Sequence, residues 1–155
     1  MEKNKKIKLL FSEPSSDVAG GVSQYILSII RYLPREEFDI HLAIPGDGPL
    51  FGVLADQNIK SHSLPVDYSI RSFLPSVFKL RKFLKKEKFD IIHLHTAKAG
   101  FIGSVASVGL PNKIIYTGHC WRFKQKESFL SRSLYYYFDR FICWSADFVT
   151  VLSDY

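Results

Sequence analysis

Residues 89–95, FDIIHLH, form an apolar run that ends in two histidines, and the chain continues directly into residues 96–108, TAKAGFIGSVASV. The first segment predicts a buried strand over residues 89–94, and the second has apolar side chains at helical spacing. The side chains that mark this helix are Ala97, Phe101, Val105 and Val108. A strand that leads directly into a helix is the repeating unit of a parallel α/β sheet.

The same alternation extends in both directions from this unit. Further strands are predicted over residues 7–12, 38–44, 59–64, 113–117 and 148–152. Helices are predicted over residues 22–33, 50–57 and 71–88, with another outlined between Phe129 and Ile142. Parallel strands joined by right-handed helical crossovers form a doubly wound, Rossmann-like, mostly parallel sheet. We therefore expect one α/β domain over residues 1–155.

The composition fits a globular domain in a reducing compartment. The chain has 155 residues, 46% hydrophobic and 23% charged, enough to bury one core. Its two cysteines, Cys120 and Cys143, are too few for a disulfide framework and form no CxxC pair. No signal-peptide core precedes the first strand, and no run approaches the roughly 18 apolar residues of a membrane span. The expected location is cytoplasmic.

The formal net charge of +6 is concentrated in two places. Four lysines precede Leu9, and the helix from Arg71 to Lys88 carries seven basic residues against the single acid Glu87. This amphipathic basic helix suits either docking at the inner face of an anionic membrane or plain solvation, and the sequence leaves both open. A nucleic-acid partner is not expected, because no recognition motif accompanies the basic residues.

Three clusters of glycine, threonine or histidine follow predicted strands. They are Gly20-Gly21-Val22, His93-Leu94-His95 and Thr117-Gly118-His119. Because ligands bind at the carboxyl ends of parallel strands, we expect the clusters to form one site.

The glycine pair has two interpretations. Glycines that open a helix let a phosphate approach the free N–H groups of its first turn, but they also serve tight turns that need a positive φ. A dinucleotide site would require GxGxxG and an acid that ends the second strand, which here runs out through Ala43, Ile44 and Pro45. A nicotinamide-dependent dehydrogenase is therefore disfavoured.

The histidines favour hydrogen bonding over metal binding. His93 and His95 are two apart and point to one face of a strand, and His119 can approach them from the next strand. Three imidazoles are zinc ligands in some proteins, but no fourth ligand has a clear spacing, so no metal is expected. Nucleophilic hydrolysis is also disfavoured, since no GxSxG elbow is present and Cys120 has no activating context.

Four segments together carry a family resemblance. They are GGV (20–22), FDIIHLHTAKAG (89–100), IYTGH (115–119) and ADFVTVLS (146–153). In this order and spacing they resemble the N-terminal, acceptor-side half of a retaining GT-B glycosyltransferase of the family-4 type.

The resemblance implies transfer of a sugar from a UDP- or GDP-linked donor, used as substrate, to a glycan or lipid-linked acceptor in surface polysaccharide biosynthesis. No cofactor is implied. The donor-phosphate residues would be Gly20, Gly21 and Val22, the catalytic residue His119, and the acceptor or cleft residues His93, His95, Thr96 and Lys98.

The sequence departs from the family pattern in two respects. The family's second domain, with its E-x7-E motif and nucleotide pocket, is missing, so we expect little turnover unless a C-terminal domain or partner chain supplies it. Cys120 and Trp121 follow His119 where relatives carry a small residue, which affects the acceptor contact. The alternative function is a non-catalytic module that binds a phosphorylated ligand or a membrane surface.

Overall fold

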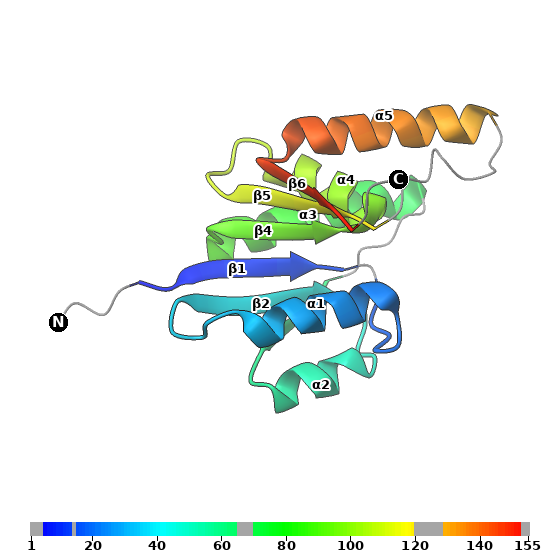
Figure 1. The fold of residues 1–155 in the computed structure, drawn as a ribbon. Coiled ribbons are helices and arrows are strands. Elements are labelled where there is room, and N and C mark those ends of the chain that lie inside the picture. The colour runs from blue at the N-terminus through cyan, green and yellow to red at the C-terminus, as the bar shows by residue number, and fades with distance from the viewer. Residues whose placement is uncertain (1–4, 14, 65–69, 120–128, 153–155) are drawn as a thin grey trace.

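Six parallel strands form a single sheet in the order β3-β2-β1-β4-β5-β6 in the computed structural model (Figure 1). The strands are β1 (Ile7–Ser12), β2 (Phe38–Ile44), β3 (Lys60–Ser63), β4 (Ile91–His95), β5 (Lys113–Gly118) and β6 (Phe148–Val151). The helices are α1 (Gly21–Tyr32), α2 (Leu50–Asp56), α3 (Ile70–Glu87), α4 (Thr96–Ser107) and α5 (Phe129–Ser145). The predicted α/β, Rossmann-like fold is confirmed.

The structure describes residues 5–13, 15–64, 70–119 and 129–152. The sequence predicts a loop over residues 65–70, of which 65–69 lie outside the described residues and Ile70 already begins α3. The first lysine of the basic N-terminus, Lys3, and the family departures at Cys120 and Trp121 also lie outside them.

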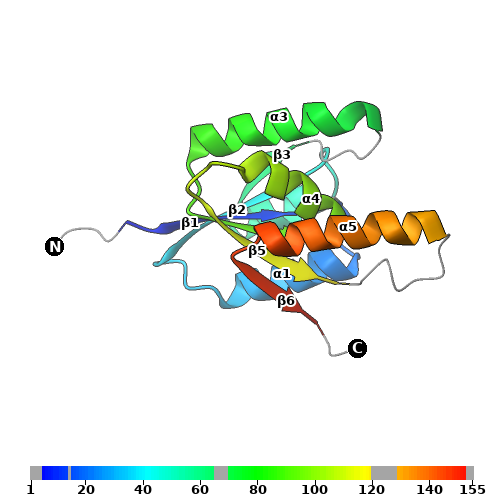
Figure 2. The same cartoon turned by 90° about the horizontal axis from the view of Figure 1, so that it is seen from above.

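Helices cover both faces of the sheet, each over its own apolar cluster (Figures 1 and 2). On one face, Ile26 and Ile30 of α1 and Leu54 of α2 pack against β1 and β2. On the other, Leu80 of α3 and Ile142 of α5 belong to a cluster with α4, β4 and β5. The sheet is therefore doubly wound, as the alternation of predicted elements indicated.

Helix α4 differs from its predicted pattern. Its fully buried residues are mostly small, and the predicted stripe residues Ala97, Phe101 and Val105 are only partly buried, while Val108 is 61% exposed. The reason is that α4 lies between α3, α5 and the sheet, so that it is enclosed from several sides. A Cβ at Gly103 would collide with Leu94 of β4, so this glycine allows the close approach.

The topology places a ligand crevice beside β1. The chain runs from β1 outward through β2 to β3, and then returns to β4 on the other side of β1. This strand order reverses between β1 and β4, and in such sheets ligands bind outside the carboxyl ends of the strands at the point of reversal. The segments that follow β1 and β4 are those that carry the glycine pair and His95-Thr96. Among the described residues, no helix is long and apolar enough to cross a bilayer.

Candidate functional site

The three histidines of the predicted site lie together at the carboxyl edge of the sheet. His93 and His95, on the same face of β4, have ring centroids 4.2 Å apart. His119, just after β5, places its Nε2 atom 3.0 Å from Nδ1 of His95. Phe11 of β1 packs against both β4 histidines, with centroid distances of 5.2 and 5.9 Å. The two histidine clusters therefore lie side by side, as the sequence predicted.

Tyr25 of α1 connects the histidines to the glycine pair. Its ring meets those of His95 and His119 edge to face, with centroids 5.8 and 5.1 Å apart. Tyr25 lies one helical turn after Gly21, so the helix that Gly21 opens is packed against the histidines. Tyr25 was not among the predicted site residues. Its spacing of four residues from Gly21 was the available signal.

A second hydrogen-bonded chain runs outward from His93. Its Nε2 lies 2.7 Å from Oγ1 of Thr117, which lies 2.7 Å from Oγ1 of Thr150 on β6. The parallel register places Thr117 opposite both His95 and Thr150. His93 is thus held in place by Thr117 of β5, the strand that His119 directly follows. Thr150 was not among the predicted site residues.

All three imidazoles are neutral at pH 7. Burial lowers the pKa of His93 to about 4, with a smaller contribution from His119. Burial also lowers the pKa of His95 well below its ordinary value, and that of His119 to a lesser degree. The histidines therefore act as hydrogen-bonding groups and do not supply positive charge to a bound anion.

The glycine loop, residues 15–21, presents the first turn of α1 without a side-chain cap. Gly20 has φ −62°, and Gly21 is not among the glycines with positive φ, so neither glycine is required by a left-handed turn. A Cβ built on Gly21 would meet nothing within 4 Å. The tight-turn interpretation therefore fails. What remains is an exposed helix N-terminus that a ligand can approach closely.

Glu13, the residue directly after β1, is 2% exposed. Its backbone N–H donates to the carbonyl of Ala43, which prolongs the β1–β2 pairing by one residue. Its Oε1 atom lies 2.9 Å from Oγ of Ser23, a buried residue in the first turns of α1, and its Oε2 atom is buried without a partner among the described residues. Burial, opposed by the Ser23 hydrogen bond, raises the pKa of Glu13 to about 7. The sequence patterns did not predict that this carboxyl group is buried, because Glu13 follows the apolar run of the first strand.

Thr96 and Lys98 begin α4 next to His95. Thr96 has φ 72°, a left-handed conformation that is strained for a β-branched residue. Its Oγ1 accepts a long hydrogen bond from the Ala99 N–H, at 3.5 Å, within the first turn of α4. Lys98 is exposed at the same edge. Both residues thus border the histidine cluster. Strained backbone conformations, such as that of Thr96, are often found at functional sites.

Metal binding was weighed for the histidines. Within the described part of the chain, no group of three or more His, Cys, Asp and Glu is arranged to hold a metal ion.

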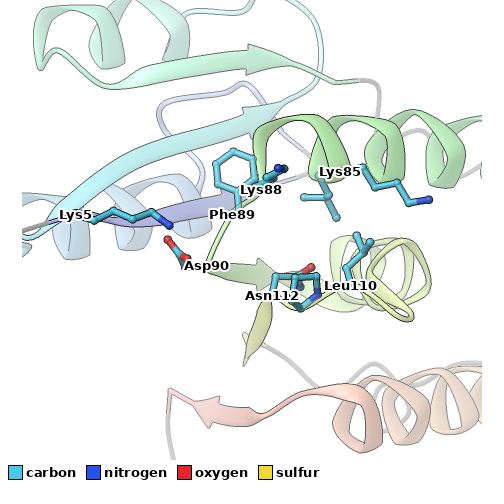
Figure 3. Close-up of a pocket in the computed structure, with 9 residues that line it drawn as sticks. Lys5, Lys85, Lys88, Phe89, Asp90, Leu110 and Asn112 are labelled. Atoms are coloured by element: carbon cyan, nitrogen blue, oxygen red, sulfur yellow. The ribbon is translucent and has the colours of Figure 1, made fainter.

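A pocket of about 520 Å³ lies at the opposite edge of the sheet (Figure 3). Its lysines, Lys5, Lys85 and Lys88, come from the N-terminal segment and from the end of α3 and the residue that follows it. None of the predicted site residues lines this pocket. Because parallel sheets bind ligands at their carboxyl edge, we do not place the transfer site here.

The structure is a doubly wound, Rossmann-like α/β domain with the glycine loop and the histidine cluster at the carboxyl edge of its sheet. The sequence matches Glycosyltransferase Family 4 over residues 19–155, and the chain belongs to this family.

Curated relatives include an Escherichia coli protein named UDP-Gal:alpha-D-GlcNAc-diphosphoundecaprenol alpha-1,3-galactosyltransferase. It is 35% identical over 109 residues, which cover 67% of this chain and 28% of the relative. An uncharacterized 41.2 kDa protein in the cps region of Klebsiella pneumoniae is 29% identical over 89% of this chain and 38% of the relative. The chain thus spans about a third of the length of these relatives.

Similar solved structures share the fold. Anabaena HepE in complex with UDP has a TM-score of 0.69 at 20% identity, over 92% of this chain and 36% of that one. Acinetobacter baumannii MurG has a TM-score of 0.65 at 14% identity, over 95% of this chain and 41% of that one.

Proposed function

We propose that this chain is the acceptor-side half of a glycosyltransferase that moves a sugar from a UDP- or GDP-sugar to a glycan or lipid-linked acceptor in surface polysaccharide assembly. The observation that carries the proposal is the convergence of the glycine loop, Tyr25 and the His95–His119 pair at the β1/β4 reversal of the sheet. Family membership supports the reaction class. The name of the Escherichia coli relative supports a UDP-sugar donor and a lipid diphosphate acceptor.

The proposed chemistry uses neutral groups on this half of the enzyme. A departing nucleoside diphosphate gains negative charge, which the free N–H groups and dipole of α1 at Gly20, Gly21 and Val22 would stabilise. The donor is the substrate, and the proposal assigns no metal or cofactor. Retention of anomeric configuration is proposed because the sequence resembles retaining glycosyltransferases.

The hydrogen bond between the histidines determines which atom of His119 meets the substrate. The Nε2 atom of His95 is buried with no partner among the described residues, and an orphaned acceptor costs less than an orphaned N–H. His95 therefore carries its hydrogen on Nδ1 and donates to Nε2 of His119. Neutral His119 then has its own hydrogen on Nδ1, and we propose that this N–H donates to a hydroxyl of the transferred sugar.

A second domain is part of the proposal, since the chain spans about a third of its curated relatives. The edge strand β6 supports it. Phe148 is 66% exposed, Val149 42% and Val151 46%, an apolar surface that further polypeptide would cover. A C-terminal domain or partner chain would bind the nucleotide and close the cleft over the histidine cluster.

Contact with a membrane is also proposed, through the outer face of α3. Leu74 and Phe78 are 60% and 67% exposed, and Lys82 and Lys86 continue the same row at intervals of four residues. Apolar side chains beside lysines on a helix suit the interface of an anionic membrane. Lys85 and Lys88 extend the basic surface to the pocket in Figure 3.

The reaction is tested with the chain joined to a family-4 C-terminal domain, a panel of UDP- and GDP-sugars, and a GlcNAc-diphosphate lipid as acceptor. Product formation that persists in EDTA supports the proposal. A folded protein that transfers no sugar from any donor contradicts it.

The membrane contact is tested separately by co-sedimentation with vesicles that contain or lack phosphatidylglycerol. Binding only to the anionic vesicles, weakened in Phe78→Ser and in Lys82→Glu, supports the α3 surface. Equal binding by wild type and variants contradicts it. The control variant Lys113→Ala changes an exposed lysine on β5, far from α3 in the sequence.

A further inference from the structure

One hydroxyl group stands between two oxygen atoms behind the glycine loop. The Oγ atom of Ser23 lies 2.5 Å from the backbone oxygen of Asp17 and 2.9 Å from Oε1 of Glu13. A serine hydroxyl has a single hydrogen to donate, and a carbonyl oxygen can only accept. Because the Asp17 contact is the shorter, we assign the hydroxyl hydrogen to it, and the longer contact is then a full hydrogen bond only when Glu13 supplies the hydrogen.

The surroundings of Glu13 favour the same conclusion. Glu13 and Ser23 are 2% and 0% exposed, so water does not share their hydrogen bonds. The charged group that acts on Glu13 is Asp17, which is also acidic. The sheet register pairs Ser12 with Ala43 of β2 and Leu94 of β4, so the residues that follow these in the chain are Glu13, Ile44 and neutral His95. A carboxylate at Glu13 would be buried near the like charge of Asp17. It would also face a Ser23 hydroxyl whose hydrogen is already donated to the Asp17 carbonyl.

We propose that Glu13 is a positioning residue for the glycine loop: as the neutral carboxylic acid it donates a hydrogen bond to Ser23, and Ser23 donates to the Asp17 carbonyl. The relay fixes the loop between β1 and α1, because Asp17 is three residues before Gly20. The loop has other ties, including Gln24 Nε2 to the Val18 carbonyl at 2.7 Å. The Glu13 tie, as proposed, depends on the proton that Glu13 carries.

The neutral form also matters for the ligand, and this step rests on the proposed function. A diphosphate at the N-terminus of α1 would be repelled by a carboxylate buried one turn away, and an uncharged carboxyl group removes that repulsion. Below its midpoint, Glu13 would thus hold the donor-facing loop in place and add no negative charge behind it.

The test uses the 155-residue chain labelled with ¹³C and ¹⁵N, without donor. We follow the side-chain carboxyl shift of Glu13 and the backbone amides of Gly20 and Gly21 from pH 4 to 9. The expected result is a Glu13 midpoint near 7, with both amides shifting at that midpoint. A midpoint near the ordinary 4.5, or glycine amides that do not follow Glu13, would overturn the proposal.

Variants separate the relay from burial alone. Glu13→Gln retains a donor for Ser23 and has no titration, so the glycine amides should stay at their low-pH positions throughout. Ser23→Ala should lower the Glu13 midpoint, because it removes the acceptor of the acid's hydrogen, whereas a rise would mean that Ser23 donates to a carboxylate. Glu36→Gln, at an exposed site, is the matched control and should leave all three signals unchanged. Since no donor is used, these outcomes are independent of sugar transfer.

Discussion

Nδ1 of His95 lies 3.0 Å from Nε2 of His119, although 24 residues separate the two in the sequence. The parallel pairing of β4 with β5 creates this contact, because it places His95 opposite Thr117 and brings the residues after β5 alongside. His119 is therefore oriented by a buried imidazole, and in the proposed function its Nδ1 atom donates to the substrate.

This orientation predicts how replacements of His119 rank. In the enzyme with its C-terminal domain, His119→Ala should lower kcat about 100-fold, as for loss of one preorganised donor. His119→Asn, whose amide N–H can replace Nδ1–H, should retain more activity than His119→Gln, whose amide reaches toward Nε2. Steady-state kinetics measures the ranking at a temperature where thermal unfolding shows each variant folded, because His119→Ala leaves the buried Nδ1–H of His95 without its acceptor. If all three variants were as active as the wild-type enzyme, His119 would not belong to the site.

Gly21 and Gly52 form a matched pair. Both open into free space, with nothing within 4 Å of an added Cβ. Val at either position should therefore change the free energy of unfolding by only about 0.5 kcal/mol. Gly21→Val should raise the donor KM about tenfold, equivalent to about 1.4 kcal/mol, because its side chain blocks the N-terminus of α1. Gly52→Val, on α2, should leave KM unchanged. A similar KM in both variants would contradict the donor-phosphate assignment.

The buried histidine His93 predicts a loss of stability in acid. Its pKa is about 4 in the folded chain and near 6.5 when unfolded. The unfolded state binds the proton first, so stability is present above pH 6.5 and is lost as the pH falls toward 4. The loss from this residue is at most about 3 kcal/mol. His93→Gln, which does not titrate, should show a loss smaller by that amount in urea unfolding at pH 7 and pH 4. The same loss in both proteins would mean that His93 is already accessible to protons.

Asp139 of α5 predicts the opposite dependence on pH. It is 3% exposed, both carboxyl oxygens lack partners among the described residues, and burial raises its pKa to about 6. The folded state keeps the proton longer, so stability falls as the pH rises from about 4 through 6. Asp139→Asn should raise the free energy of unfolding at pH 8, by at most about 3 kcal/mol, and much less at pH 5. An unchanged melting temperature at pH 8 would show that the carboxylate is solvated.

Local patterns predicted the strands closely where a strand is a short apolar run. The predicted strands at 7–12 and 38–44 match β1 and β2 to the residue. Helix α4 was harder, because its buried side includes Gly100, Gly103 and Ser104, which carry no apolar signal, and its burial comes from neighbours distant in sequence.

Part of the candidate site could be predicted because the carboxyl ends of parallel strands lie at the same edge of a sheet. This rule brought His93, His95 and His119 together, and the structure agrees. The rule gives no contacts between a loop and a helix, so the roles of Tyr25 and Glu13 depend on where α1 packs.

Complementation tests the central claim most directly. The chain, a family-4 C-terminal domain, and an equimolar mixture of the two are each assayed for transfer from labelled UDP-galactose to a GlcNAc-diphosphate lipid. The account predicts product in the mixture and in neither part alone. Equal transfer by the C-terminal domain with and without this chain, or no transfer by a mixture shown to associate, would contradict the assignment of the chain as half of a glycosyltransferase.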